Sequence, residues 1–158
     1  MTVVARTLTV RAAPGRVLDH LRDFGNSARW DPAARTVRLD EGPIAVGSSW
    51  HHHSKIRGVA IELTYALSVA ERDRLVFVGR NEGATSTETV TVRTVAGGTE
   101  VTYHVDLQIH GLAKLMTPVM RAEFERLGTA IAARLTDVLD RLAPPHRGGQ
   151  PDRAAGDS

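Results

Sequence analysis

The feature that most constrains this chain is the change in hydrophobic periodicity at Gly111. Before this point, apolar and polar residues mostly alternate in short runs separated by turn residues, a pattern typical of half-buried strands. After it, apolar residues recur every three to four positions, which predicts one amphipathic helix of about thirty residues. Strands followed by a long helix indicate an α+β protein rather than an alternating α/β one.

A strand and two short helices are predicted at the start of the chain. The strand covers Val4–Val10, and the first helix covers Pro14–Asp23 with its proline in the first turn. A second short helical turn is predicted at Asn26–Trp30. It has to end before Pro32, because the residue preceding a proline is biased away from helical angles.

Six further strands are predicted before the long helix. They are Thr36–Asp40, Ser48–Arg57, Val59–Ala70, Arg74–Arg80, Thr85–Val95 and Thr99–His110. Gly58 indicates a tight turn or bulge, and Gly97-Gly98 indicates a two-residue hairpin. Connections this short force neighbouring strands to be antiparallel. We therefore expect a strongly curved seven-stranded sheet, built from a six-strand meander and the N-terminal strand.

The C-terminal helix is the only large element that can cover this sheet. Pro118 predicts a kink or a helix start near Thr117. The apolar stripe of the helix comprises Leu112, Met116, Met120, Phe124, Leu127, Ile131, Leu135, Val138 and Leu142. Seven strands are wide for one helix, so a ligand-sized cavity is expected between them, with a fully packed core as the alternative. No apolar anchor follows Ala143, which predicts one domain over 1–143 and a flexible tail over 144–158.

Composition excludes several classes of protein. The chain is 42% hydrophobic with a net charge of +2, unlike a disordered protein. It has no cysteine and no apolar run of the ~20 residues that span a membrane. Its 20 basic residues are interleaved with 18 acidic ones, and only 4% of residues are aromatic, which disfavours nucleic-acid binding. We expect a cytoplasmic monomer or homodimer, and the absence of nucleotide-binding fingerprints predicts no cofactor.

Several short motifs at turns and strand ends carry a resemblance to a known family. They are Ala13-Pro14 with Val17, Trp30-Asp31-Pro32, Gly42-Pro43 with Val46-Gly47, Arg74-Leu75-Val76-Phe77, Gly98-Thr99-Glu100-Val101-Thr102-Tyr103 and the closing helix. Over about residues 3–142 the chain resembles the START-like (SRPBCC) superfamily, and within it the polyketide cyclase/dehydrase-like branch. The resemblance implies a helix-grip fold, with a curved antiparallel sheet wrapped around the C-terminal helix. It also implies binding of lipids, steroids, polyketides or other apolar molecules, and in some members cyclisation or dehydration of polyketides.

Strand alternation predicts which side chains face the interior. The apolar residues at alternate positions of Val59–Ala70 define an inward side that includes Val59 and Tyr65. The same reasoning turns Trp50, His52, Ser54, Ser86, Glu88 and Tyr103 inward. A polar group on an apolar face costs roughly 1–3 kcal/mol unless it has a partner. The partner could be a ligand or a local group, such as Arg80 for Glu88.

The His51-His52-His53 run suggests a metal site, but the alternation argues against one. Only the first and third histidines share a face of the strand, and that face is the solvent side. A catalytic zinc usually has three protein ligands, and no third ligand can be identified. We therefore predict no metal.

Three functions remain open from the sequence. The leading hypothesis is binding of a small hydrophobic molecule such as a lipid or polyketide, with candidate ligand-binding residues Trp50, Tyr65, Tyr103, Met116, Met120 and Phe124. The alternative is a cofactor-independent enzyme of the polyketide cyclase/dehydratase type, in which Glu88 or His52 removes a proton next to a carbonyl. The third is a partner-binding module, which would have an interior filled by its own side chains.

Overall fold

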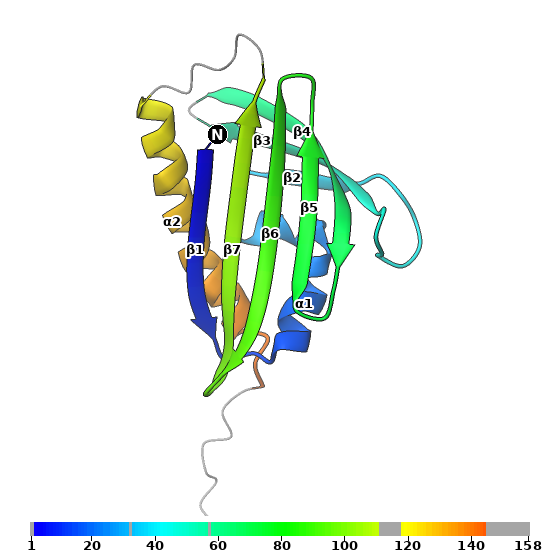
Figure 1. Ribbon diagram of the computed structural model, residues 1–158, viewed down its shortest axis with the longest axis vertical. Coiled ribbons are helices and arrows are strands. Elements are labelled where there is room, and N and C mark those ends of the chain that lie inside the picture. Colours follow the sequence, from blue (N-terminus) through cyan, green and yellow to red (C-terminus); the bar gives the residue numbers. More distant parts are fainter. Residues whose placement is uncertain (1, 32, 57, 111–117, 145–158) are drawn as a thin grey trace, which may run out of the picture.

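The computed structural model describes residues 2–31, 33–56, 58–110 and 118–144. Its elements, in chain order, are β1 (Thr2–Val10), α1 (Pro14–Arg22), the short 3₁₀ helix η1 (Phe24–Arg29), β2 (Arg35–Arg38), β3 (Ser49–Ile56), β4 (Val59–Ala70), β5 (Arg74–Arg80), β6 (Ala84–Val95), β7 (Gly98–Ile109) and α2 (Pro118–Asp140). The seven strands form one antiparallel sheet in the order β1-β7-β6-β5-β4-β3-β2. This confirms the predicted meander, with the N-terminal strand placed beside β7 (Figure 1).

The hairpin between β6 and β7 forms one residue earlier than predicted. Val95 pairs with Gly98, so the loop is Ala96-Gly97, and Gly97 has a φ of 81°. The second glycine has a different role. A Cβ on Gly98 would lie 1.9 Å from the carbonyl oxygen of Val10, so glycine is required where the end of β1 lies against the start of β7.

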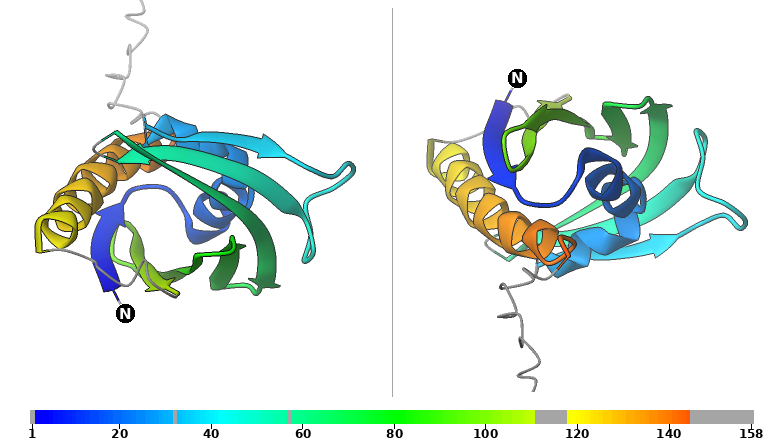
Figure 2. Two further views of the ribbon diagram at one scale, coloured as in Figure 1. Left: turned by 90° about the horizontal axis from the view of Figure 1, so that it is seen from above. Right: turned by 90° about the horizontal axis from the view of Figure 1, so that it is seen from below.

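The curled sheet leaves one side open, and α2 covers it. Figure 2 shows this helix lying across the opening, with α1 and η1 packed inside the curve. The kink or helix start predicted near Thr117 lies outside the described residues. The described helix covers Pro118–Asp140 and has 23 residues. It is shorter than the predicted thirty or so, and the expected first part falls in 111–117, outside the described residues. No helix in the described part of the chain is both long and apolar enough to cross a membrane.

The hydrophobic core lies at the end of the molecule that holds α1 and η1. Its largest members are Leu18, Leu21, Phe24, Trp30, Trp50, Tyr65, Leu67, Leu75, Phe77, Leu135 and Leu139. The two buried residues of α2, Leu135 and Leu139, both belong to its C-terminal half. The N-terminal half of the helix therefore extends beyond the packed core.

One residue predicted to face inward is exposed. Val59 lies at the start of β4 and is 54% exposed, whereas Leu63, Tyr65 and Leu67 on the same side of that strand are buried. The prediction for Val59 was wrong, because this residue lies at the turn end of the β3–β4 hairpin, where its side chain is left exposed to solvent.

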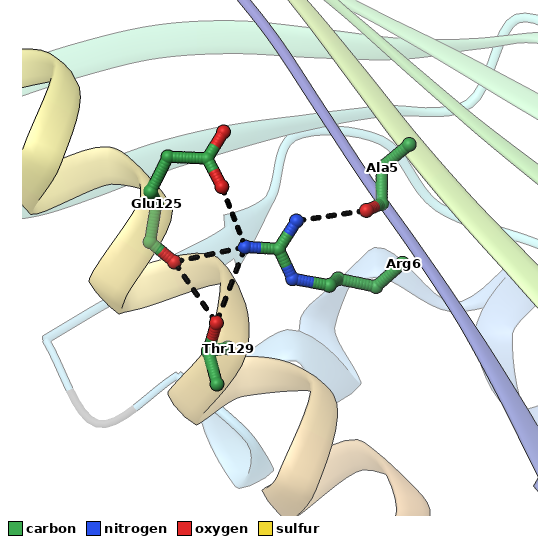
Figure 3. A network of polar contacts seen from close by, with 4 residues as sticks. All are labelled: Ala5, Arg6, Glu125 and Thr129. Carbon is green, nitrogen blue, oxygen red and sulfur yellow. Dashed lines mark hydrogen bonds and ion pairs between the residues drawn. The ribbon is translucent and has the colours of Figure 1, made fainter.

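The seam between β1 and α2 is held by Arg6. Its Nη2 atom donates hydrogen bonds to the carbonyl oxygen of Glu125 (3.0 Å), to Oε2 of Glu125 (2.7 Å) and to Oγ1 of Thr129 (3.2 Å), as Figure 3 shows. The helix comes close to the strand here, because a Cβ on Gly128 would lie only 2.7 Å from a methyl group of Val4. Arg6 thus joins two elements that lie at opposite ends of the sequence.

Replacing Arg6 with methionine is expected to lower the free energy of unfolding by about 1 kcal/mol, because three acceptors on α2 lose the hydrogen bonds that the partly buried guanidinium donates. Urea denaturation measures the change. Arg93→Met is the matched control, because Arg93 also pairs with a glutamate but is 71% exposed, and such pairs contribute about 0–1 kcal/mol. If both variants lost the same free energy of unfolding, the contacts of Arg6 would contribute no more than a surface ion pair.

Candidate ligand-binding site

A cavity of about 150 Å³ lies between the sheet and α2. Most of its wall is apolar, with Val4, Leu8, Phe24, Trp30, Ile56, Ile61, Leu63, Val105, Leu107, Phe124, Leu127, Ile131, Ala132 and Leu135 among the lining residues. An apolar cavity of ~150 Å³ is large enough for a molecule of the size of benzene. This cavity is partly open to solvent, so a longer molecule can extend from it. The predicted hollow is therefore present, and the partner-module hypothesis loses the filled interior on which it depended.

Glu88 is the centre of a polar cluster in this cavity. Its Oε1 accepts a hydrogen bond from the hydroxyl of Tyr65 at 3.1 Å, and its Oε2 accepts one from the hydroxyl of Tyr103 at 2.5 Å. The three residues come from β4, β6 and β7, and the curl of the sheet turns their side chains toward one another. The partners of Glu88 are thus two phenols rather than Arg80, which is exposed at the end of β5.

Burial raises the pKa of Glu88, and the negative charge of Asp31 raises it further, while the two tyrosine hydroxyls act in the opposite direction. Burial also raises the pKa of Tyr65 and of Tyr103 well above 10, and the neighbouring Glu88 charge adds to both shifts. Both phenols therefore keep their protons at neutral pH and act as donors to the carboxylate.

Tyr65 is fixed in place by residues on two sides. Its ring lies directly over Gly79 of β5, its cross-strand partner, where an added Cβ would be 2.6 Å from the ring. The ring of Phe24 stacks on it with a centroid distance of 4.5 Å and an interplanar angle of 30°. The missing side chain at Gly79 and the aromatic contact from η1 together determine where the Tyr65 hydroxyl points.

His52 also lines the cavity, as predicted. Its Nδ1 lies 3.0 Å from Oγ1 of Thr36, which in turn lies 3.0 Å from Oγ of Ser27. Burial, followed by the charges of His53 and His51, lowers the pKa of His52 to about 4. This histidine is therefore neutral at pH 7. His51, on the other side of β3, has its Nε2 3.9 Å from a carboxylate oxygen of Glu62.

The remaining candidates are divided between the cavity and other places. Phe124 lines the cavity. Trp50 is fully buried in the core against Phe24 and Phe77 and is not among the lining residues. Met120 is half-buried on α2 and is also not among them, and Met116 lies outside the described residues.

Sequence reasoning missed Asp31 as a site residue. It follows η1, lines the cavity, and has its pKa raised chiefly by burial. It was noted only as part of the Trp30-Asp31-Pro32 motif. This segment has no periodicity from which an inward side chain could be deduced.

Two solved structures illustrate the similarity in fold. A START superfamily protein from Mycobacterium smegmatis has a TM-score of 0.72 at 13% identity, with 90% of this chain and 100% of that chain covered. The ZhuI aromatase/cyclase from Streptomyces sp. R1128 has a TM-score of 0.70 at 18% identity, with 88% and 93% covered. No curated protein sequence matches the chain. The model of one family, described as polyketide cyclase / dehydrase and lipid transport, matches residues 1–143, and the chain belongs to this family.

Proposed function

We propose that the protein binds a small, largely apolar molecule in the cavity, with the polar group of that molecule at the Glu88 cluster. The observation that carries the proposal is the distribution of polarity in the cavity. Its walls are mostly aliphatic and aromatic, while Tyr65, Tyr103 and Glu88 are hydrogen-bonded to one another at one place. An apolar pocket with a few convergent polar groups is the usual form of a small-molecule site.

Strand register supports an orientation for the ligand. Glu88 lies opposite Phe77 of the buried core, whereas Ser86 and then Ala84 lead along β6 toward the level of Leu107 and Ile109. The polar cluster is therefore at the core end of the cavity. An apolar body would extend from it along the wall formed by β7 and the N-terminal half of α2.

The proposal is tested by closing the cavity from α2. Ala132 lines it, whereas its neighbour Ala133 is exposed on the same helix. We expect wild-type protein and Ala133→Phe to bind the neutral fluorescent probe N-phenyl-1-naphthylamine saturably. Ala132→Phe should lose this binding by at least about tenfold, because the added ring takes up much of the volume.

Native mass spectrometry of freshly purified wild-type protein should also show a lipophilic adduct that is released on denaturation. Circular dichroism checks that both phenylalanine variants are folded. Binding of the probe to folded Ala132→Phe with wild-type affinity would overturn the proposal.

The second candidate is an enzyme of the cyclase or dehydratase type, and the raised pKa of the half-buried Glu88 favours it. Glu88 would take a proton from the carbon next to a ketone, leaving an enolate whose oxygen needs a donor. Both tyrosine hydroxyls donate to Glu88, so one of them would have to turn to the enolate. This hypothesis requires that Glu88→Gln abolish turnover of a poly-ketone while probe binding is retained.

A further inference from the structure

The described lining of the cavity has more acidic groups than unpaired basic ones. Apart from the tyrosines, four of its residues have side chains that can carry a charge: Arg6, Asp31, His52 and Glu88. The guanidinium of Arg6 is paired with Glu125 at 2.7 Å. His52 is neutral at pH 7, since burial lowers its pKa to about 4. Within the described lining, two carboxyl groups therefore face the cavity without a cation assigned to them there.

The two carboxyl groups retain capacity to accept hydrogen bonds. A carboxylate has about four acceptor positions, and each oxygen of Glu88 accepts one tyrosine hydroxyl. Asp31 accepts the backbone N–H of Ala33 at Oδ1, at 3.1 Å. The charge of Arg134 acts on Asp31 from α2, but the Arg134 side chain is exposed and the effect of burial on Asp31 is larger.

The two tyrosine hydroxyls of the cluster already donate to Glu88. A tyrosine hydroxyl has one hydrogen, and both Tyr65 and Tyr103 direct theirs to Glu88. A ligand carbonyl would have to compete with Glu88 for these hydrogens. A ligand carboxylate would in addition place a third carboxyl group beside Glu88 and Asp31.

Aromatic rings surround the two carboxyl groups. Phe24, Trp30, Tyr65 and Tyr103 all line the cavity together with Asp31 and Glu88. Phe24 also contacts Tyr65 and His52, and these two contact each other, so these three rings form one connected group. A cation placed over aromatic faces is stabilised by their quadrupoles, and the stabilisation increases when water is excluded.

We infer that the natural ligand carries a basic nitrogen, bound as an ammonium group between Glu88 and Asp31 and against these rings. This inference rests on the proposed function and specifies the class of ligand. The ammonium supplies a positive charge and hydrogen-bond donors to the two carboxyl groups, which have no paired cation within the described lining, and the apolar part of the amine occupies the aliphatic wall.

Three probes of similar shape and different charge test the inference. They are 2-phenylethylamine, 2-phenylethanol and 3-phenylpropionate, and their dissociation constants are measured at pH 7 by protein-observed NMR titration. We expect the amine to bind at least about tenfold more tightly than the alcohol, and the carboxylate to bind most weakly. Glu88→Gln and Asp31→Asn should each reduce the ratio of amine affinity to alcohol affinity several-fold, because each variant removes a carboxylate that the ammonium group needs and the alcohol does not. Glu82→Gln, at an exposed position between β5 and β6, is the matched control and should preserve it.

The outcomes separate this inference from the proposed function. If the alcohol binds as tightly as the amine, or the carboxylate binds best, the inference is wrong and the cavity still binds apolar molecules. The inference also falls if the amine preference persists in both variants, or if none of the three probes binds although N-phenyl-1-naphthylamine does. If the naphthylamine does not bind either, the proposed function itself fails.

Discussion

Replacing Gly79 with alanine is expected to weaken binding of N-phenyl-1-naphthylamine by about tenfold or more and to lower the free energy of unfolding by about 1–3 kcal/mol. The added Cβ would lie 2.6 Å from the ring of Tyr65, and the stacked ring of Phe24 limits movement on the other side. The Tyr65 ring therefore has to shift. The shift withdraws its hydroxyl from Glu88 and moves the ring into the cavity, so one methyl group changes both the polar cluster and the volume.

Gly15→Ala is the matched control for this substitution. No atom lies within 4 Å of a Cβ built on Gly15, which is inside α1. Alanine there should leave binding unchanged and raise stability by up to about 1 kcal/mol, because alanine is a better helix former than glycine. Fluorescence titration and urea denaturation measure both quantities. If Gly79→Ala bound the probe with wild-type affinity, the position of the Tyr65 ring would not determine probe binding.

Most of the fold could be predicted because its elements have strong and different periodicities. The strands β4 and β5 have the bounds expected from the sequence, since turn residues mark both of their ends. The position of the β6–β7 loop could not be predicted, because Gly97-Gly98 does not show which glycine serves the turn and which makes room for the carbonyl of Val10.

The site was only partly predictable, because alternation gives the side of a strand and not the neighbours of a side chain. Glu88, Tyr65 and Tyr103 were placed inside by that rule. Their mutual hydrogen bonds depend on how strongly the sheet curls, since β4 and β6 are separated by β5. Similarly, the apolar stripe of the C-terminal helix did not show that Phe124 would reach the cavity and Met120 would not. That difference depends on the rotation of α2 about its axis.

His52 makes the stability of the protein depend on pH in a predictable direction. Burial lowers its pKa from 6.5 to about 4 in the folded chain. Between these values the unfolded chain binds a proton that the folded chain does not, so the free energy of unfolding decreases as the pH falls from 6.5 to 4. The full difference corresponds to about 3 kcal/mol, which is present above pH 6.5 and lost at pH 4.

His52→Asn removes this titration and keeps a polar group near Thr36. Its unfolding free energy should therefore decrease less steeply than that of the wild type over the same range, by up to about 3 kcal/mol. The comparison between variants isolates His52 from the other buried groups. The lowered pKa of His20 acts in the same direction, whereas the raised pKa values of Glu88 and Asp31 favour the folded state as the pH falls.

His110→Asn, at an exposed position after β7, is the matched control and should follow the pH dependence of the wild type. Urea denaturation of the three proteins at half-unit intervals between pH 4 and pH 7 measures the slopes. If the unfolding free energy of His52→Asn had the same pH dependence as that of the wild type, His52 would be protonated as readily in the folded wild-type protein as in the unfolded chain. In that case its side chain would be open to water, and the wall of the cavity beside Phe24 and Tyr65 would not be closed as the structure places it.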